Sequence, residues 1–249
     1  MPETHHDVLV LGAGFIGGRV AAMGAAAGLG VGAWTRHPVE GPAFDASRPS
    51  DVERLVGHSA RCLVVTFPLV EHPALWPVLA SHPAHVVLLG TTGSHQRAPV
   101  IDEDTPEVAG HPRLASEAAV LASGGTVLRL AGLYGSPRDP LRWLAAGRVG
   151  REPRQVNLVH GDDVARLVLE VAADPQPGVF VVSDGERHTW AVIAETAHAA
   201  GRLPTLPPPT PPKKPSGFVD PARVRARWPG AGFRSLLGAL GDAGAPWPD

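Results

Sequence analysis

The sequence predicts an α/β fold in which a doubly wound parallel sheet is joined to a small C-terminal lobe. Short, apolar, β-rich runs alternate with helical segments through the first 130 residues. Runs that are apolar throughout are typical of strands buried on both faces of a parallel sheet. A cluster of glycines directly follows the first run. Apolar residues make up 44% of the 249 residues, enough for a core, although the chain also has 29 Gly and 27 Pro.

The N-terminal part repeats a strand and a helix several times. Aliphatic and β-branched runs predict strands at 7–11, 31–35, 62–67, 85–89 and 126–130, with a further short strand at Phe44. Helices are expected at 15–27, 50–57, 74–81 and 112–123. Ser50 is a candidate N-cap, because Glu53 stands three residues later as its capping-box partner. This alternation favours parallel strands connected by right-handed crossovers.

After Gly132 the pattern changes. We expect helices at 141–146, 162–173 and 189–200, and extended segments at 155–160 and 179–182. Thr189 is a candidate N-cap for the last of these helices. Residues 203–215 hold seven prolines in thirteen positions, which favours a polyproline II connector on the surface.

The charge and the cysteine content of the chain exclude several classes of protein. The 22 Lys+Arg and 24 Asp+Glu give a formal net charge of −2, which argues against a nucleic acid or a membrane surface held by bulk electrostatics. One cysteine excludes an internal disulfide framework and suits a reducing compartment. The first residues lack the basic start of a secretory signal, and the uncharged run 20–35 is too short for a membrane span. We therefore expect a cytoplasmic protein. We expect no metal site, because His82 and His85 lie on either side of a proline turn and would not face each other as ligands.

The glycine cluster is the most informative motif. Gly12, Ala13, Gly14, Phe15, Ile16 and Gly17 fit G-x-G-x-x-G between a predicted strand and a predicted helix. The first glycine permits the tight turn, the second lets a pyrophosphate approach the backbone, and the third lets the helix pack closely on the strand. The N-terminus of the helix then supplies free N–H groups to the phosphates. The motif predicts a dinucleotide in a Rossmann-type fold.

The end of the second strand favours NADP over NAD. An acidic residue there would bind the ribose 2′-hydroxyl of NAD. This chain has Thr35 and Arg36 instead, so no carboxylate repels a 2′-phosphate. The Arg36 guanidinium matches the geometry of a phosphate, and Thr35 adds a hydroxyl.

Several further motifs occur in a characteristic order. They are Asp45 after Phe44, the Gly90–Gly93 segment that closes a strand, residues 101–106, Arg113 with Glu117, residues 129–135, and residues 157–165. Together with the glycine motif, they make the chain resemble the extended and atypical short-chain dehydrogenase/reductase superfamily, and in particular small NAD-dependent epimerase/dehydratase-like proteins. The resemblance covers nearly the whole length.

The resemblance implies a role for each matching position. Asp45 would bind the adenine amino group, Phe67 and Pro68 would line the adenosine and ribose, Thr91 and Thr92 would orient a substrate oxygen, and Leu133 and Tyr134 would lie near the nicotinamide. It also implies a cofactor-binding core at 1–135. Residues 136–249 would then form a substrate lobe interleaved with the remainder of the core.

The chain departs from the superfamily at its usual catalytic pair. The Tyr-x-x-x-Lys positions hold Ala109 and Arg113. Arg113 can still bond to a ribose, but its guanidinium does not deprotonate. Downstream of Thr92, His95 stands where related proteins often have a tyrosine, so we expect His95, with Thr91 or Thr92, to supply the remaining acid/base function.

Two functions from different classes remain open. The first is an NAD(P)-dependent oxidoreductase or epimerase/dehydratase-like enzyme that acts on a small polar or nucleotide-sugar-like substrate. The second is a non-catalytic NADP-binding redox sensor or scaffold, which the loss of the Tyr/Lys pair favours. The sequence specifies neither the substrate nor the oligomeric state.

Overall fold

A six-stranded parallel sheet forms the centre of the protein. The computed structural model describes residues 5–38, 43–211 and 216–242. The strands lie in the order β10-β6-β4-β3-β1-β2, and every neighbouring pair is parallel. Their bounds are β1 His6–Leu11, β2 Val31–Trp34, β3 Ala60–Val65, β4 His85–Thr91, β6 Thr126–Leu130 and β10 Gly178–Val182.

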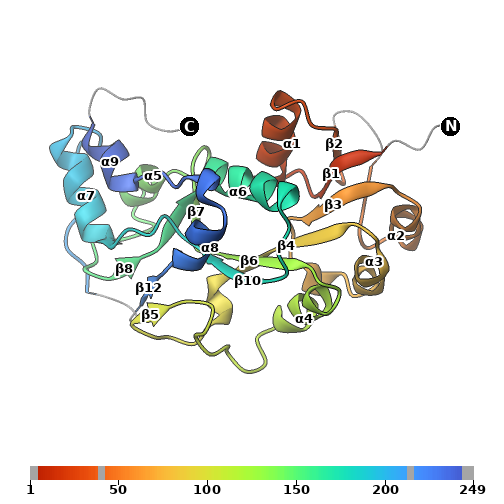
Figure 1. Cartoon of the computed structure of the whole chain (residues 1–249). Helices are drawn as coiled ribbons and strands as arrows, with labels where there is room; N and C mark the ends of the chain where they lie inside the picture. Colours follow the sequence, from red (N-terminus) through yellow and green to blue (C-terminus); the bar gives the residue numbers. More distant parts are fainter. Residues whose placement is uncertain (1–4, 39–42, 212–215, 243–249) are drawn as a thin grey trace.

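Helices cover both faces of this sheet (Figure 1). Helices α1 (Gly17–Ala26) and α6 (Gly161–Ala173) share one hydrophobic cluster with the strands. Helices α2 (Pro49–Val56), α3 (Leu75–Ser81) and α4 (Leu114–Ala122) pack on the opposite face in a second cluster. The predicted Rossmann-type fold class is therefore confirmed.

A third hydrophobic cluster lies beside the sheet, at the left of Figure 1. It is built from α5 (Pro140–Ala145), α7 (Trp190–Ala199) and α9 (Leu236–Gly241). Three short strand pairs and helix α8 complete the described structure: β5 Val100–Ile101 with β12 Phe218–Val219, β7 Gly132–Tyr134 with β9 Leu158–His160, β8 Gln155–Val156 with β11 His188–Thr189, and α8 Ala222–Arg227. Single 3₁₀ turns occur at Leu69–Glu71, Thr92–Ser94 and Pro229–Ala231.

The predicted strands of the sheet lie within two residues of the observed ones, but two local predictions are wrong. Phe44 is not in a strand, because pairing with the end of β2 is limited to a single bridge between Thr35 and Ala43. The Phe44 ring is buried and packs against Trp34, with ring centroids 5.5 Å apart. Ser50 does not cap α2, because the helix begins one residue earlier at Pro49, a residue type favoured at the first helical position. The Thr189 cap is confirmed, since its hydroxyl accepts a hydrogen bond from the Val192 amide.

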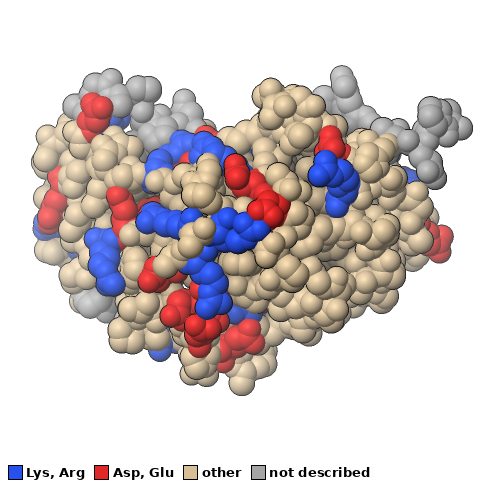
Figure 2. Space-filling model, in the orientation of Figure 1, with Lys and Arg blue, Asp and Glu red and all other residues tan. Residues whose placement is uncertain are grey.

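The surface carries interspersed charges on the face shown in Figure 2, where basic and acidic side chains gather over α6 and α8. Arg166 and Arg234 both pair with Asp163, which joins the segment before α9 to α6. In the proline-rich segment, Pro209 bridges to Arg151, while residues 212–215 lie outside the described part of the chain. None of the described helices has both the length and the apolar character needed to cross a membrane.

Candidate functional site

The site lies where the strand order reverses. Strand β2 lies on one side of β1, and the next strand, β3, lies on its other side. Open α/β sheets bind ligands at such a reversal, outside the carboxyl ends of the strands. Leu11 at the end of β1 pairs in register with Val65 at the end of β3. The next residues, Gly12 and Thr66, therefore face each other, and the Thr66 hydroxyl donates a hydrogen bond to the Gly12 carbonyl at 2.5 Å.

The three glycines have different steric surroundings. Gly12 has a φ of +98°, and a Cβ there would lie 2.6 Å from Thr66 Oγ1. A Cβ on Gly17, the first residue of α1, would lie 2.0 Å from the Gly12 carbonyl oxygen. A Cβ on Gly14 would meet nothing within 4 Å, so the backbone at this point is open to a ligand. This is the cradle that a pyrophosphate requires.

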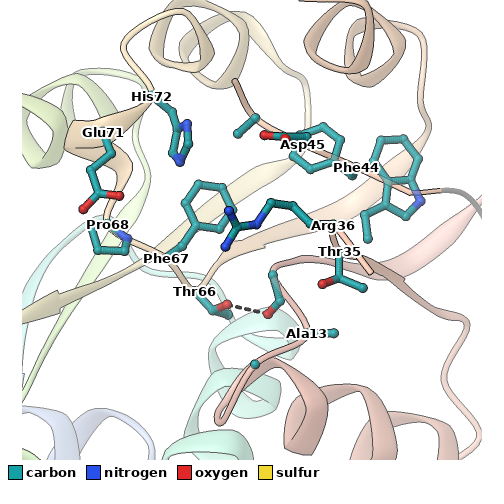
Figure 3. A pocket seen from close by; sticks show the side chains of 14 residues that line it. Ala13, Thr35, Arg36, Phe44, Asp45, Thr66, Phe67, Pro68, Glu71 and His72 are labelled. Atoms are coloured by element: carbon teal, nitrogen blue, oxygen red, sulfur yellow. Dashed lines mark hydrogen bonds between the residues drawn. The ribbon is translucent and has the colours of Figure 1, made fainter. Parts of the chain in front are cut away.

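A pocket of about 370 Å³ opens beside this turn (Figure 3). Its lining includes most of the predicted cofactor-binding residues: Gly12, Ala13, Gly14, Thr35, Arg36, Asp45, Phe67 and Pro68. Figure 3 shows the Arg36 side chain reaching from the end of β2 into the pocket. The acidic residues in its lining, Asp45 and Glu71, come from other loops and not from the end of β2.

Asp45 is held in place by its own loop. Its Oδ1 accepts hydrogen bonds from the Ser47 hydroxyl at 2.7 Å and the Ser47 amide at 3.0 Å. These bonds lower the pKa of Asp45 below its ordinary value, so the carboxylate stays ionised. Its Oδ2 lies 3.9 Å from Arg48 Nε, too far for a hydrogen bond, and can accept one from a ligand.

A second cavity of about 390 Å³ continues from the first and shares Thr66, Phe67 and Pro68 with it. It lies at the ends of β4 and β6, where Thr91 pairs in register with Leu130. The predicted residues that line it are Ile16, Phe67, Pro68, Thr91, Arg113 and Leu133. The two cavities together offer a continuous crevice across the strand ends.

The chemistry available in the second cavity is limited. The Thr91 hydroxyl oxygen accepts a bond from the Gly93 amide at 3.2 Å, which leaves its hydrogen available to a ligand. Arg113 and Arg138 line the cavity, and none of the described residues in its lining is a carboxylate, histidine, tyrosine or lysine. The cavity therefore provides hydrogen bonding and positive charge, but no group that exchanges a proton near neutral pH.

His95 lies outside both cavities, which argues against the proton-transfer role expected for it. It is 4% exposed, its Nδ1 lies 2.9 Å from the Thr105 carbonyl oxygen, and its Nε2 lies 3.0 Å from Arg129 Nη1. Because Arg129 can only donate, Nε2 accepts and Nδ1 carries the hydrogen. Both nitrogens are thus occupied in a buried network, in which Glu117 also binds Arg129 at 2.7 Å.

Tyr134, which the resemblance places near the nicotinamide, lines neither cavity. It is 0% exposed and belongs to the core of the C-terminal lobe, where its ring packs edge-on against His160. Burial, and after it the charge of Asp184, raises the pKa of Tyr134 well above its ordinary value. A buried phenol of this kind is not available as a catalytic acid.

Two other predicted residues do not contribute side chains to the crevice. The Thr92 hydroxyl points to the Leu130 carbonyl at 3.4 Å, and Thr92 lines neither cavity. The Phe15 ring is stacked by the guanidinium groups of Arg19 and Arg138, at 4.2 and 4.8 Å from its centroid. Phe15 can contribute its backbone N–H to a phosphate, but its ring lines neither cavity.

The segment that replaces the Tyr/Lys pair is not helical. Helix α4 begins at Leu114, while Ala109 and Gly110 form a turn, with a φ of +73° at Gly110. The conformation at Gly110 and the proline at 112 keep the helix from extending back to these positions. Only Arg113, immediately before the helix, reaches the second cavity.

Sequence reasoning missed several lining residues: Thr66, Glu71, His72 and Arg138. Thr66 directly follows β3 at the edge of the sheet where ligands bind, whereas the sequence places it inside the predicted strand 62–67. Arg138 reaches the cavity only through the fold of residues 135–138, where the Gly135 and Arg138 backbones bond to each other. No local sequence pattern predicts that Arg138 lies at the second cavity.

No family model and no curated protein sequence matches the chain. Solved structures do match over nearly its whole length. The Bordetella bronchiseptica enzyme WbmH in complex with NAD⁺ is 17% identical, with a TM-score of 0.76, over 95% of this chain and 96% of that one. MoeE5 in complex with UDP-glucose and NAD is 20% identical, with a TM-score of 0.75, over 94% and 96%.

A third similar structure is the human epimerase family protein SDR39U1 (isoform 2) with NADPH. It is 20% identical, with a TM-score of 0.71, over 95% of this chain and 98% of that one. At such identities the likeness concerns the fold. The chain therefore shares the Rossmann-type fold of these proteins.

Proposed function

We propose that the crevice binds a nicotinamide dinucleotide, NADP in preference to NAD. The observation that carries this proposal is the glycine turn at the end of β1, open at Gly14, beside a pocket lined by Arg36. A guanidinium with no carboxylate at the end of β2 suits a 2′-phosphate. The similar structures with NAD⁺, NAD and NADPH support a dinucleotide without deciding between the two cofactors.

The function that fits best is that of an oxidoreductase or epimerase/dehydratase-like enzyme acting on a small polar or nucleotide-sugar-like substrate. The dinucleotide, when bound, supplies or accepts a hydride. Thr91 donates its hydroxyl hydrogen to the substrate oxygen, and Arg113 stabilises negative charge on that oxygen. The proton itself comes from solvent, since no lining group of the second cavity exchanges one near neutral pH.

We assign cofactor binding and substrate binding to the two parts of the chain that the sequence predicts. Residues 1–135 hold the cofactor, and residues 136–249 form the substrate lobe, although α6 and β10 from this part return to the sheet. Leu133 and Arg138, on either side of the division, both line the second cavity. Substrate specificity is therefore expected from the junction of the two parts.

Titration of the protein with NADPH and NADH, in the wild type and in Arg36→Ala, tests the cofactor assignment. We expect tighter NADPH binding in the wild type, and a loss of about tenfold or more in NADPH affinity in the variant, since one hydrogen-bonded charge pair is removed. NADH affinity should stay unchanged. Tighter binding of NADH by the wild type, unaffected by Arg36→Ala, would contradict the assignment.

The lack of a proton-exchanging group in the second cavity favours one alternative, a non-catalytic NADP-binding sensor or scaffold. A panel of carbonyl compounds separates the two functions. NADPH oxidation with any member supports the enzyme. Tight NADPH binding without turnover, together with a partner protein that associates only with one redox form of the cofactor, supports the sensor.

A further inference from the structure

A buried polar cluster lies in the C-terminal lobe, outside the crevice. It consists of Asp184, Glu186 and His188, three alternate residues between β10 and α7. One side-chain nitrogen or oxygen from each lies within 4.8 Å of the other two. Asp184 and His188 are 2% and 1% exposed, whereas the Glu186 side chain is 26% exposed, so the cluster is reached from solvent past Glu186.

The imidazole of His188 lies between the two carboxylates without bonding to either. Its Nε2 is 3.9 Å from Asp184 Oδ2, and its Nδ1 is 3.7 Å from Glu186 Oε2, both longer than a hydrogen bond. Among the described residues, no group pairs with either ring nitrogen or with Asp184 Oδ2. Each unpaired buried polar atom costs about 1–3 kcal/mol, so these three atoms require an external partner.

The contrast with His95 shows that this arrangement is not forced by burial alone. His95 is equally enclosed, yet both of its ring nitrogens have protein partners. The hydroxyl of Tyr134, on which the charge of Asp184 acts, is a further buried polar group without a partner in the described part of the chain. Asp184, His188 and Tyr134 thus each carry a buried polar atom without a partner among the described residues.

Backbone amide groups hold the two carboxylates in place. The Glu186 amide donates to Asp184 Oδ1 at 3.1 Å, and the Leu237 amide of α9 lies 3.4 Å from Glu186 Oε2. Gly185, with a φ of +71°, makes the turn between them, and a Cβ there would lie 2.7 Å from Arg225 Nη2. Such supporting contacts orient ligands around a metal.

We propose that Asp184, Glu186 and His188 bind a divalent transition-metal ion of the Zn²⁺ type. One imidazole nitrogen and two carboxylate oxygens form a ligand set that suits such ions. The 3.9 and 3.7 Å distances start from the two different ring nitrogens of His188, of which a single ion binds only one. One ring nitrogen and one oxygen from each carboxylate lie within 4.8 Å of one another, close to the separation of about 4.2 Å that two atoms bound at about 2.1 Å to one ion can reach. The ion supplies the missing partner of one His188 ring nitrogen and of Asp184 Oδ2, and it joins three positions of the segment before α7. This departs from the expectation that the chain holds no metal.

The test is a titration of EDTA-treated, full-length protein with Zn²⁺, and separately with Mn²⁺, followed by calorimetry and by thermal unfolding. We expect one equivalent to bind and the melting temperature to rise, because the ion binds only the folded arrangement. Glu186→Gln, at the most exposed ligand, should lower the affinity about tenfold or more. Glu195→Gln, which removes an exposed carboxylate on α7, is the matched control and should bind like the wild type.

Histidines elsewhere in the chain bind Zn²⁺ too, so the stoichiometry in the variants decides. Glu186→Gln and His188→Gln should each lose one equivalent relative to Glu195→Gln. If His188→Gln does not fold, Glu186→Gln alone decides. Unchanged stoichiometry and affinity in Glu186→Gln, or a wild type that binds neither ion, would overturn the proposal and leave water as the partner of these atoms.

Discussion

Gly14→Ala separates cofactor binding from folding. The new Cβ would meet nothing within 4 Å, and Gly14 is not among the glycines with a positive φ. Alanine therefore fits the folded chain and reduces the freedom of the unfolded one, so the free energy of unfolding should be unchanged or about 0.4–1 kcal/mol higher. A change of this size raises the melting temperature by at most about 4 °C for a chain of this length.

The same substitution should impair dinucleotide binding strongly. The methyl group would occupy the open side of the turn, where a pyrophosphate oxygen meets the backbone. Loss of one hydrogen bond to a charged group costs about 1.5–3 kcal/mol. At 1.4 kcal/mol for each factor of ten, NADPH affinity should fall about 10- to 100-fold.

Gly17→Ala, within the same motif, is the contrasting control. Its Cβ would lie 2.0 Å from the Gly12 carbonyl oxygen and 2.9 Å from Val10 Cγ1. Forcing a methyl group into such a contact costs about 1–3 kcal/mol or more. This variant should lose stability first, with a melting temperature several degrees below that of the wild type.

NADPH fluorescence titration and thermal unfolding of the three proteins provide the test. Gly14→Ala should retain its melting temperature and lose affinity, whereas Gly17→Ala should lose melting temperature. If Gly14→Ala bound NADPH within about twofold of the wild type, the dinucleotide would not lie on this turn. If it melted as low as Gly17→Ala, the steric argument itself would be wrong.

Three further predictions concern buried and cavity-lining groups. Glu117→Gln leaves the 2% exposed Arg129 guanidinium with Glu107 as its remaining carboxylate partner. Urea unfolding should show a loss of about 3 kcal/mol; a loss below about 1 kcal/mol would mean that the pair behaves like a surface one. Burial raises the pKa of the Cys62 thiol to about 12, so the thiol stays protonated from pH 7 to pH 9 and iodoacetamide should modify it only at the rate of unfolding; rapid alkylation of the native protein would refute this. Thr91→Val should lower kcat with any substrate found while NADPH affinity stays unchanged, and an unaltered kcat would remove Thr91 from the site.

The sequence by itself determined the sheet, the helices and the glycine turn at the end of β1. These features depend on short-range patterns: apolar runs of strand length, helical spacing, and glycines at fixed distances. Each pattern acts within a few residues, so Gly12, Gly14 and Gly17 could be assigned before any long-range contact was known. The basic residue Arg36, which stands after β2 where NAD-binding proteins have an acidic residue, could be recognised from the sequence for the same reason.

Only the tertiary structure decided where the other polar side chains lie. His95 follows β4 in sequence, but hydrogen bonds to Arg129 and Thr105 hold its ring in a buried network. Tyr134 turns into the core of the C-terminal lobe, and Arg138 reaches the second cavity. The burial and the hydrogen-bond partners of these side chains depend on elements that are remote in the chain. The partners that those elements offer determine the direction in which each side chain points. For that reason the crevice that we propose to bind the cofactor could be predicted from local motifs, whereas the positions of His95 and Tyr134 and the Asp184 cluster could not.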